Sequence, residues 1–307
     1  MSNQYARAIV NPASRGSSTL KEWPLISRHL NDKGLLFDYV FTEGAGHAIE
    51  LTKQAINEDC RYIIAVGGDG TVHEVVNGII NSDDPANTFL GIISSGTTCS
   101  FARSIGIPPD PIKSCNSLIS QNTILVDVGV VQCWSQEQLI QRYFVNEASA
   151  GFSAEIVDNW KYLPPLFGHS VNLALRTVAG YKSLATHRNQ KLSLYIGDEV
   201  ESINCCSVFV ANGRYLADGM QIAPHASLDD GLLDVVIIGD VSKSELLKIR
   251  PKLYNGSHIK HAKIREKKAT TITIKSEKQL LVEVDGEMLG NGPVTFSILP
   301  SALQVVI

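Results

Sequence analysis

The most restrictive feature of this sequence is a short apolar strand that runs directly into a glycine-rich turn and then into a helix. Residues 62–66 are apolar, and the turn that follows reads GGDGT from Gly67 to Thr71. Behind the turn, apolar side chains recur at the spacing of one helix face, at Val72, Val75, Val76 and Ile79. Such a strand–turn–helix unit is typical of a parallel α/β sheet, with the turn at its carboxyl edge.

The same alternation of strand and helix fills the first 127 residues. Apolar strands are expected at 5–10, 35–42, 62–66 and 89–93. Helices are expected from Ser17 or Ser18 towards Gly34, then at 48–57 and 72–80. This rhythm predicts an α/β domain with a mainly parallel, doubly wound sheet.

The second half of the sequence is rich in short runs of β type. They lie at 192–196, 208–211, 233–238, 271–274 and 280–284, with helices expected at 171–185 and 244–254. This spacing predicts a β-rich antiparallel sandwich or barrel. The rhythm changes near Asp127, so we expect a nucleotide-binding domain at 1–127 and a substrate domain at 128–292. In an alternative division, the last segment, about 293–307, returns to the first domain.

Composition and charge narrow the class of protein. The formal net charge is −4, which argues against general nucleic-acid binding because that needs a dense basic face. The six cysteines form no CxxC pair, and the start of the chain lacks the apolar segment of a signal peptide. No apolar stretch reaches the length of a membrane-spanning helix. We therefore expect free thiols and a cytoplasmic location.

The GGDGT turn has the residues that a phosphate site needs. Glycines let the backbone adopt positive φ and let phosphate oxygens approach its N–H groups, and a helix N-terminus adds positive potential. Asp69 is expected to hold Mg²⁺ or to meet a substrate hydroxyl, and Thr71 is expected to cap the helix. The alternative interpretation is an ordinary turn between a strand and a helix.

Two further polar loops follow strands in the same way. They read NPASRGS at 11–17 and SSGTT at 94–98. Because the carboxyl ends of parallel strands meet at one edge of a sheet, we expect all three loops to converge on one crevice. The chain lacks both the GxxxxGK[ST] P-loop and the GxGxxG fingerprint, which disfavours a Walker-type ATPase and an ordinary dehydrogenase.

Several segments of the sequence together resemble one known family. They are GGDGT at 67–71, the Asn11-Pro12 loop, GTTCSFARSIGIP at 96–108, VNEASAGF at 145–152, NGRY at 212–215, IAPHASLDDGLLD at 222–234 and VDGE at 284–287. This set resembles the diacylglycerol kinase catalytic-domain family of bacterial lipid kinases. That family includes the YegS-like and DgkB-like enzymes and is related to the sphingosine kinases. The resemblance covers nearly the whole chain in the right order.

The resemblance implies a fold, a nucleotide site and a metal site. It implies an N-terminal α/β domain of the NAD kinase and diacylglycerol kinase type, a β-rich sandwich behind it, and an active site in the cleft between the two. The implied ATP contacts are Asn11, Pro12, Ser14, Gly16, Ser17, Thr42, Gly67, Gly68, Asp69, Gly70, Thr71, Glu74, Gly96 and Thr97. The family's magnesium site falls by position on Asp230, with the backbone oxygens of Ser227 and Leu232.

The Asp285-Gly286-Glu287 motif is the expected source of the general base. A carboxylate there can take the proton of the acceptor hydroxyl, while Asp69 holds a catalytic Mg²⁺ that bridges the β- and γ-phosphates. Which of Asp285 and Glu287 takes the proton stays open. Taken alone, the motif also fits a simple hairpin turn.

The sequence departs from the usual family pattern at one loop. Many members carry Pro-x-Gly-Thr-x-Asn-Asp there. In this chain Ser94 stands in place of the proline, and Cys99 and Ser100 stand in place of the Asn-Asp pair. The replaced acid lies near the acceptor in relatives, so the identity of the lipid stays open.

These observations predict a kinase that uses ATP and Mg²⁺ to phosphorylate the hydroxyl of a diacylglycerol-like lipid, in phospholipid biosynthesis. Its lipid partner suggests a peripheral protein at the inner membrane face, where the basic run 260–268 is either a contact for anionic headgroups or a solvated strand and turn. A homodimer is a further expectation, because an exposed sheet edge can pair. The alternatives are a small-molecule kinase of the NAD kinase type and a non-catalytic regulator that binds nucleotide or lipid.

Overall fold

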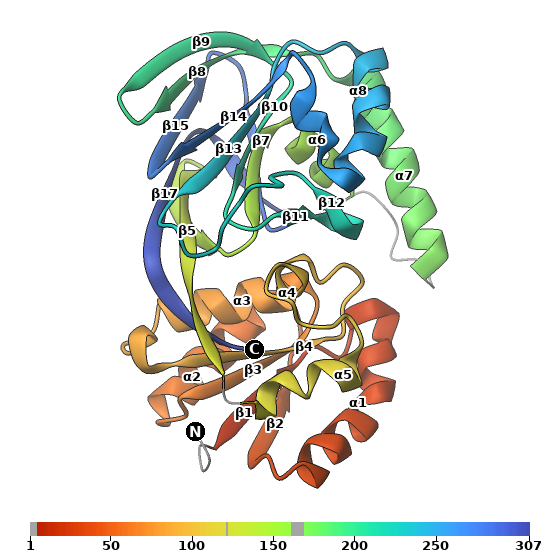
Figure 1. The fold of residues 1–307 in the computed structure, drawn as a ribbon, viewed down its shortest axis with the longest axis vertical. Helices are drawn as coiled ribbons and strands as arrows, with labels where there is room; N and C mark the ends of the chain where they lie inside the picture. The colour runs from red at the N-terminus through yellow and green to blue at the C-terminus, as the bar shows by residue number, and fades with distance from the viewer. Residues whose placement is uncertain (1–4, 121, 161–168) are drawn as a thin grey trace. The chain divides into compact units, whose positions relative to one another are not determined.

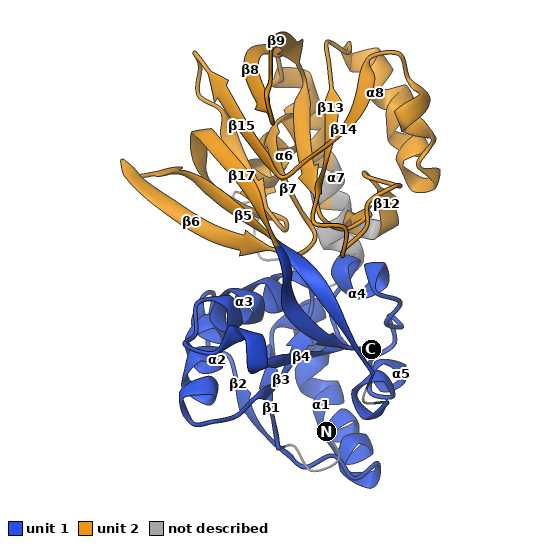
Figure 2. Cartoon of the chain, turned by 60° about the vertical axis from the view of Figure 1, so that its left-hand side comes forward, with its two compact units in different colours: residues 1–128, 300–307 blue, residues 129–299 orange. Residues whose placement is uncertain are grey.

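The computed structural model divides the chain into two compact units (Figure 2) and describes residues 5–120, 122–160 and 169–307. Unit 1 takes the chain up to residue 128 together with 300–307, and unit 2 takes residues 129–299. The sequence predicted that the second domain ends at residue 292, and in the alternative division residues 293–307 return to the first domain. The difference arises because the long strand β17 (Glu287–Val306) contributes residues to both units.

Unit 1 is built on a parallel sheet. Its strands are β1 (Ala6–Val10), β2 (Phe37–Phe41), β3 (Tyr62–Gly67) and β4 (Phe89–Ser94), in the order β4-β3-β1-β2. All three neighbouring pairs are parallel, and the end of β17 adds to β4 in the same direction. Every residue of β3 is buried, as expected for a strand that helices cover on both faces. The predicted α/β domain with a parallel sheet is confirmed.

Helices lie on both faces of this sheet (Figure 1). They are α1 (Ser14–Asp32), α2 (His47–Asn57), α3 (Asp69–Ile80), α4 (Ser100–Ser104) and α5 (Pro111–Ser114). On one face, Trp23, Ile26 and Leu30 of α1 pack against alternate residues of β1 and β3. Helices α2 and α3 pack against each other on the other face.

Unit 2 is β-rich and antiparallel. Its strands are the second part of β5 (Thr123–Ser135), β6 (Gln138–Phe144), β7 (Glu147–Gly151), β8 (Gln190–Ile196), β9 (Glu199–Cys205), β10 (Ser207–Ala211), β11 (Tyr215–Leu216), β12 (Met220–Gln221), β13 (Leu233–Ile238), β14 (Ile264–Ala269), β15 (Thr271–Ser276), β16 (Leu281–Val284) and the first part of β17. One row of strands runs β14-β13-β10-β7-β16-β17, and a second runs β17-β15-β8-β9. The neighbours in both rows pair antiparallel.

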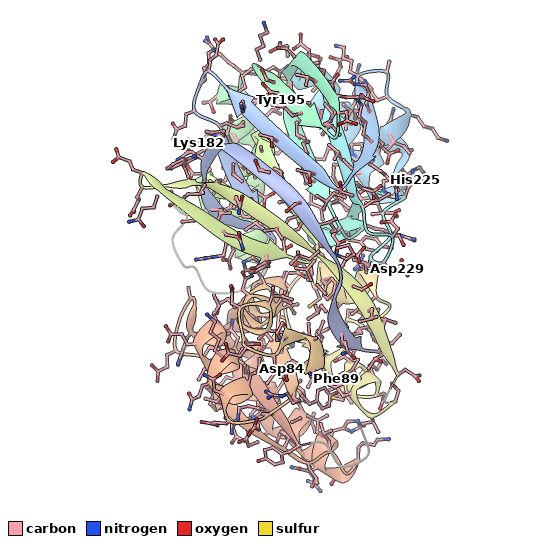
Figure 3. The ribbon with its side chains drawn as sticks, turned by 90° about the vertical axis from the view of Figure 1, so that its left-hand side faces the viewer. Asp84, Phe89, Lys182, Tyr195, His225 and Asp229 are labelled. Atoms are coloured by element: carbon pink, nitrogen blue, oxygen red, sulfur yellow. The ribbon has the colours of Figure 1, made fainter. Side chains whose placement is uncertain are left out.

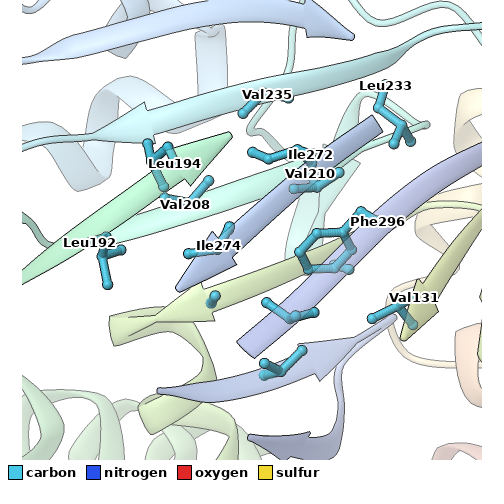
Figure 4. Packing of buried hydrophobic residues seen from close by; sticks show 14 of the residues in the cluster. Val131, Leu192, Leu194, Val208, Val210, Leu233, Val235, Ile272, Ile274 and Phe296 are labelled. Carbon is cyan, nitrogen blue, oxygen red and sulfur yellow. The ribbon is translucent and has the colours of Figure 1, made fainter. Parts of the chain in front are cut away.

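The core of unit 2 joins these two rows of strands (Figure 4). Val210 and Val235 from the first row belong to the same buried cluster as Leu194 and Ile272 from the second, and Phe296 of β17 completes it. Because alternate residues of a strand point to the same face, each row contributes one apolar face to this cluster. The predicted β-rich sandwich is confirmed.

The described part of unit 2 also contains the α-helices α6 (Phe152–Trp160), α7 (His169–Thr186) and α8 (Lys243–Ile249). The helix predicted at 171–185 corresponds to α7. The helix predicted at 244–254 is shorter, because a tighter turn (Arg250–Asn255) with Pro251 in its first positions follows α8, and proline cannot continue an α-helix. Among the described residues, no helix combines the length and the hydropathy that crossing a bilayer requires.

Candidate functional site

The loops that follow the parallel strands of unit 1 contact one another. Asn11, after β1, donates a hydrogen bond from Nδ2 to the Oγ1 of Thr71 at 3.0 Å. The N–H of Ser95, after β4, donates to the carbonyl oxygen of Gly67 at 2.9 Å. The hydroxyl of Thr19 donates to the carbonyl oxygen of Ser95 at 3.1 Å. The predicted convergence of the three loops is therefore confirmed.

Two of these loops touch each other through glycines. A methyl group on Gly96 would lie 2.1 Å from the Cα of Gly68, and one on Gly67 would lie 2.3 Å from the Oγ1 of Thr71. Neither position can take a side chain unless neighbouring atoms move. Gly68 is the N-cap of α3 and Gly70 lies in its first turn, so the closely packed backbone here also carries the N–H groups of a helix N-terminus.

The start of α3 differs from the prediction in one respect. The prediction that Thr71 caps the helix is wrong, because the N-cap is Gly68 and no side chain caps it. Thr71 is buried in the first turn instead, where its hydroxyl receives the hydrogen bond from Asn11. This hydrogen bond links the loop after β1 to the glycine-rich turn.

Asp69 binds the start of α4. Its Oδ2 accepts hydrogen bonds from the hydroxyl of Thr98 at 2.6 Å and from the N–H of Ser100 at 2.9 Å. Its Oδ1 accepts one from the N–H of Phe101 at 3.1 Å. An ionised carboxylate offers about four acceptor positions, so three of them are used within unit 1. The role of Asp69 in holding Mg²⁺ stays a prediction.

The loop after β1 contains three consecutive residues with a left-handed backbone. The angle φ is 51° at Arg15, 64° at Gly16 and 69° at Ser17, so α1 becomes regular only after Ser17. Non-glycine residues in this conformation cost about 1–3 kcal/mol each, and they cluster at ligand-binding segments. Gly16 and Ser17 are exposed. The other predicted contacts of this loop are half-buried, namely Asn11, Pro12 and Ser14.

Thr42 and Glu74 hold the loop after β2. Thr42 is buried, and its N–H donates to the carbonyl oxygen of the last residue of β1 at 2.9 Å. Glu74 accepts hydrogen bonds from the N–H of Gly46 at 2.7 Å and from the N–H of Ala48 at 3.0 Å. Glu74 on α3 therefore caps the N-terminus of α2. The ATP contacts of Thr42, Glu74 and the exposed Thr97 stay predictions.

The two residues that replace the family's Asn-Asp pair are buried. Burial raises the pKa of the Cys99 thiol to about 11. The N–H of the buried Ser100 donates a hydrogen bond to the Asp69 carboxylate. At neutral pH these two positions therefore offer a neutral thiol and a hydroxyl in place of an amide and a carboxylate.

In unit 2, Asp285 and Gly286 form the turn between β16 and β17. Val284 pairs with Glu287 across the hairpin, and φ is 46° at Asp285 and 84° at Gly286. Two-residue turns in which both residues are left-handed match the twist of the flanking strands, and Asp-Gly is a preferred pair for them. The hairpin interpretation of this motif is confirmed. Asp285 lies in the turn, and Glu287 follows it as the first residue of β17.

Backbone N–H groups hold the carboxylate of Asp285. Its Oδ1 accepts from Asn146 at 3.2 Å and from Glu147 at 3.1 Å, and its Oδ2 accepts from Val145 at 3.4 Å. The N–H of Asp285 donates to the carbonyl oxygen of Glu147 at 2.8 Å. Glu287 is exposed. The two predicted acids thus lie in different surroundings, one held by the backbone and one open to solvent.

Two buried acids beside this turn escaped prediction from the sequence. Glu283 is 1% exposed and Glu147 is 2% exposed. Glu283 pairs with Ser149 across β16 and β7, and Glu147 lies two residues before Ser149, so the two acids are on the same face of the sheet. Burial raises the pKa of Glu283 to about 7. Glu283 could have been noticed in the sequence, because it is an acid inside the apolar run LLVEV. Burying a charge away from water costs free energy, so an acid in such a run is unusual.

The predicted magnesium ligand Asp230 already binds a lysine. Its Oδ2 lies 2.6 Å from the Nζ of Lys268, and its Oδ1 accepts a hydrogen bond from the N–H of Leu232 at 3.1 Å. The Nζ of Lys268 also lies 3.4 Å from the carboxylate of Asp234. A positive charge is therefore present at the position where the resemblance implies a metal ion.

The surroundings of Asp230 do not fit a magnesium ion as long as Lys268 stays bound, because the ammonium group contacts one carboxylate oxygen and the N–H of Leu232 donates to the other. The hydroxyl of Ser227 donates a hydrogen bond to the Oδ1 of Asp229 at 2.6 Å. Asp229 is exposed and is labelled in Figure 3. Among the residues that the structure describes, no group of three or more His, Cys, Asp or Glu side chains could hold a metal ion.

The two halves of the chain match two family models. Residues 5–131 match the diacylglycerol kinase catalytic domain, and residues 150–307 match the YegS C-terminal NAD kinase beta sandwich-like domain. A diacylglycerol kinase of Staphylococcus carnosus (strain TM300) is 28% identical over 98% of this chain and 94% of its own length. A diacylglycerol kinase of Staphylococcus haemolyticus (strain JCSC1435) is 30% identical over 98% of this chain and 87% of its own length.

Solved structures share the fold. A diacylglycerol kinase from Bacillus anthracis str. Sterne matches with a TM-score of 0.72 at 20% identity, over 99% of this chain and 96% of that one. A yeast NADH kinase complexed with NADH matches with a TM-score of 0.56 at 10% identity, over 98% of this chain and 82% of that one. At these identities the likeness shows the fold, an N-terminal α/β part followed by a β-rich part.

Proposed function

The chain belongs to the diacylglycerol kinase family of lipid kinases, and we propose that it transfers the γ-phosphate of ATP to the hydroxyl of a diacylglycerol or a closely related lipid alcohol. The observation that carries this proposal is the match of both halves of the chain to that family's domains, in order. The relatives named above are diacylglycerol kinases, which favours diacylglycerol as the acceptor.

In this proposal, unit 1 binds the triphosphate. The first turn of α3 leaves backbone N–H groups without helical partners, and the helix dipole favours negative charge there. Gly68 and Gly70 lie at this helix start and leave room for phosphate oxygens beside the backbone. The exposed Gly16 and Ser17 offer further contacts from the loop after β1. Mg²⁺ arrives with the substrate, bound to the phosphates of ATP.

Unit 2 supplies the general base. The acceptor hydroxyl must lose its proton as its oxygen bonds to phosphorus. We assign this proton to Asp285, because three backbone N–H groups hold its carboxylate in one position, and a base acts efficiently only when it is fixed. Glu287 at the other end of the turn is the second candidate. No step is assigned to a metal ion at Asp230, where Lys268 already lies.

A transfer assay tests the proposal. Purified protein is given γ-labelled ATP, Mg²⁺ and mixed micelles that contain dioleoylglycerol, and we expect label in phosphatidic acid. Monoacylglycerol, sphingosine and NAD are offered as other acceptors. Label on NAD alone would overturn the proposal in favour of a kinase of the NAD kinase type. ATP binding without transfer to any acceptor would favour a non-catalytic regulator.

Two variants in the same assay separate the candidate bases. We expect Asp285→Asn to lower kcat by about 10²- to 10⁴-fold with little change in the KM for ATP, and Glu287→Gln to lower it less than about tenfold. Asp198→Asn, at an exposed hairpin tip of unit 2, is the control and should behave like the wild type. The reverse order of the two effects would assign the proton to Glu287.

Two expectations about the surroundings of the enzyme belong to this proposal as well. A lipid acceptor brings the protein to a membrane surface, as a peripheral protein of the inner face. Self-association as a homodimer is the second expectation. Sedimentation with phospholipid vesicles and the mass of the protein in solution test the two separately.

A further inference from the structure

One buried acid that the proposed chemistry does not use lies against the Asp285–Gly286 turn. Glu283 sits in β16 between two buried valines, and almost none of its surface reaches solvent. Its Oε2 accepts a hydrogen bond from the N–H of Gly286 at 3.1 Å. Its Oε1 accepts one from the hydroxyl of Ser149, on the neighbouring strand β7, at 2.6 Å. Glu283 therefore ties the turn to the sheet.

Glu147, at the start of β7, borders the same turn from the other side. Its backbone N–H and carbonyl oxygen both bond to Asp285. Its buried side chain lies on the same face of the sheet as that of Glu283, as a diagonal neighbour across the two strands, within reach of long side chains. Ionised carboxylate oxygens only accept hydrogen bonds, so two buried carboxyl groups that meet can hydrogen-bond to each other only when one of them carries a proton. Two ionised carboxylates side by side in a buried place would also repel each other strongly.

We propose that Glu283 and Glu147 share one proton, and that this singly protonated pair is a positioning element that fixes the Asp285–Gly286 turn for phosphoryl transfer. The inference rests on the proposed function, because it concerns the turn that carries the general base. The pair does not touch the substrate in this account. It acts by keeping Gly286, and with it Asp285, in one conformation.

The charges around Glu283 explain why the shared proton matters. Glu147 faces it from β7, Asp285 belongs to the turn, and Glu287 begins β17. Helix α6, which packs against β16, adds further acids in Glu155, which is bonded to His187, and Asp158. When the pair loses its proton, a second negative charge appears beside Asp285 and loosens the turn. Because the pKa of Glu283 is about 7, this loss occurs near neutral pH.

The direction of the pH dependence follows from the raised pKa of Glu283. The pKa of Glu283 is raised in the folded chain above its ordinary value of 4.5, so its contribution to stability is present below about pH 4.5 and is lost as the pH rises through about 7. We expect kcat of the wild type to fall at least about threefold as the pH rises from about 7 to about 9. Glu283→Gln, a neutral side chain of the same shape, should keep kcat nearly constant over that range.

Glu277→Gln, an exposed acid of the same unit, is the control and should show the same fall as the wild type. Glu147→Gln serves as a second variant in case Glu283→Gln does not fold, since its amide can donate the hydrogen bond that the shared proton provides. An unchanged fall of kcat at high pH in both variants would overturn the proposal.

A second measurement does not depend on the lipid reaction. The melting temperature of the wild type should fall as the pH rises from about 5 to about 8, beyond the trend shown by Glu283→Gln. Parallel melting curves of the two proteins across this range would show that no proton is shared. If no lipid is phosphorylated but the melting curves differ as expected, the proposed function fails while the shared proton stands.

Discussion

Gly96 is the residue on which the packing of the loop after β4 against the glycine-rich turn depends most directly. An added methyl group there would lie 2.1 Å from the Cα of Gly68, and the obstacle is backbone rather than the end of a flexible side chain. Any side chain at position 96 therefore pushes the loop after β4 away from the glycine-rich turn. Both loops contain predicted ATP contacts.

We expect Gly96→Ala to weaken ATP binding by at least about tenfold and to lower the free energy of unfolding by about 1–3 kcal/mol, because the overlap forces the backbone to shift. Calorimetric ATP titration and urea unfolding measure the two effects. Gly180→Ala in α7 is the control, since its added methyl group meets no atom within 4 Å. Wild-type ATP affinity in Gly96→Ala would remove this loop from the nucleotide site.

Three of the predicted site acids have the same structural role. Asp69, Glu74 and Asp285 each accept hydrogen bonds from backbone N–H groups of another segment of their own unit. Hydrogen bonds to charged groups contribute about 1.5–3 kcal/mol each, so these carboxylates stabilise their loops whatever else they do. Alanine substitutions at these positions mix loss of chemistry with loss of loop structure, and amide substitutions separate the two better.

Strand β14 is joined to the loop before β13 by the ion pair between Lys268 and Asp230. Lys268 belongs to the basic run that the sequence suggested as a contact for lipid headgroups. Its ammonium group instead neutralises an acid of its own unit, where relatives are expected to place magnesium. Lys268 thus links β14 to the loop before β13 at the place where relatives are expected to bind a magnesium ion.

We expect Lys268→Ala to make the melting temperature depend on Mg²⁺ in the absence of ATP, because Asp230 then lacks a cation. The wild type and the exposed control Lys278→Ala should show no such dependence. Thermal melts over a range of Mg²⁺ concentrations measure this effect. Equal stabilisation of the wild type by Mg²⁺ would mean that the metal displaces the lysine, as the family resemblance implies.

Across the whole molecule, the cysteines share one chemical state. All six are buried free thiols. Burial raises the pKa to about 11 for Cys133 and to about 12 for Cys115 and Cys205. Since the thiolate is the reactive form of cysteine, such thiols are inert. The thiols that the sequence predicted to be free are therefore buried in the hydrophobic interiors of the two units.

We expect no cysteine of the folded protein to react with an aromatic disulfide reagent at mildly alkaline pH, and all six to react after unfolding in guanidinium. Absorbance of the released thiol measures the count in both states. Rapid reaction of any thiol in the folded chain would show that one of the cores opens to solvent. Addition of ATP should then slow that reaction if the opening lies in unit 1.

The α/β half could be predicted closely from the sequence. The strand expected at 62–66 is β3 (Tyr62–Gly67), and the helix expected at 72–80 is the body of α3. Apolar periodicity and turn chemistry act within a few residues, so they can be read from the chain alone. In unit 2, strands such as β9 were missed, because the run EVESINC is mostly polar and becomes a strand only by pairing with β8.

The sequence by itself determined the family, the order of strands and helices in the first half, and the turns on which the candidate site residues lie. Only the tertiary structure decided what each acid binds. Asp69 reaches the loop after β4, and Asp285 and Glu283 reach β7, about 140 residues earlier in the chain. These contacts depend on sheet order and register, which place β7 beside β16, and no local pattern encodes a partner so distant along the chain.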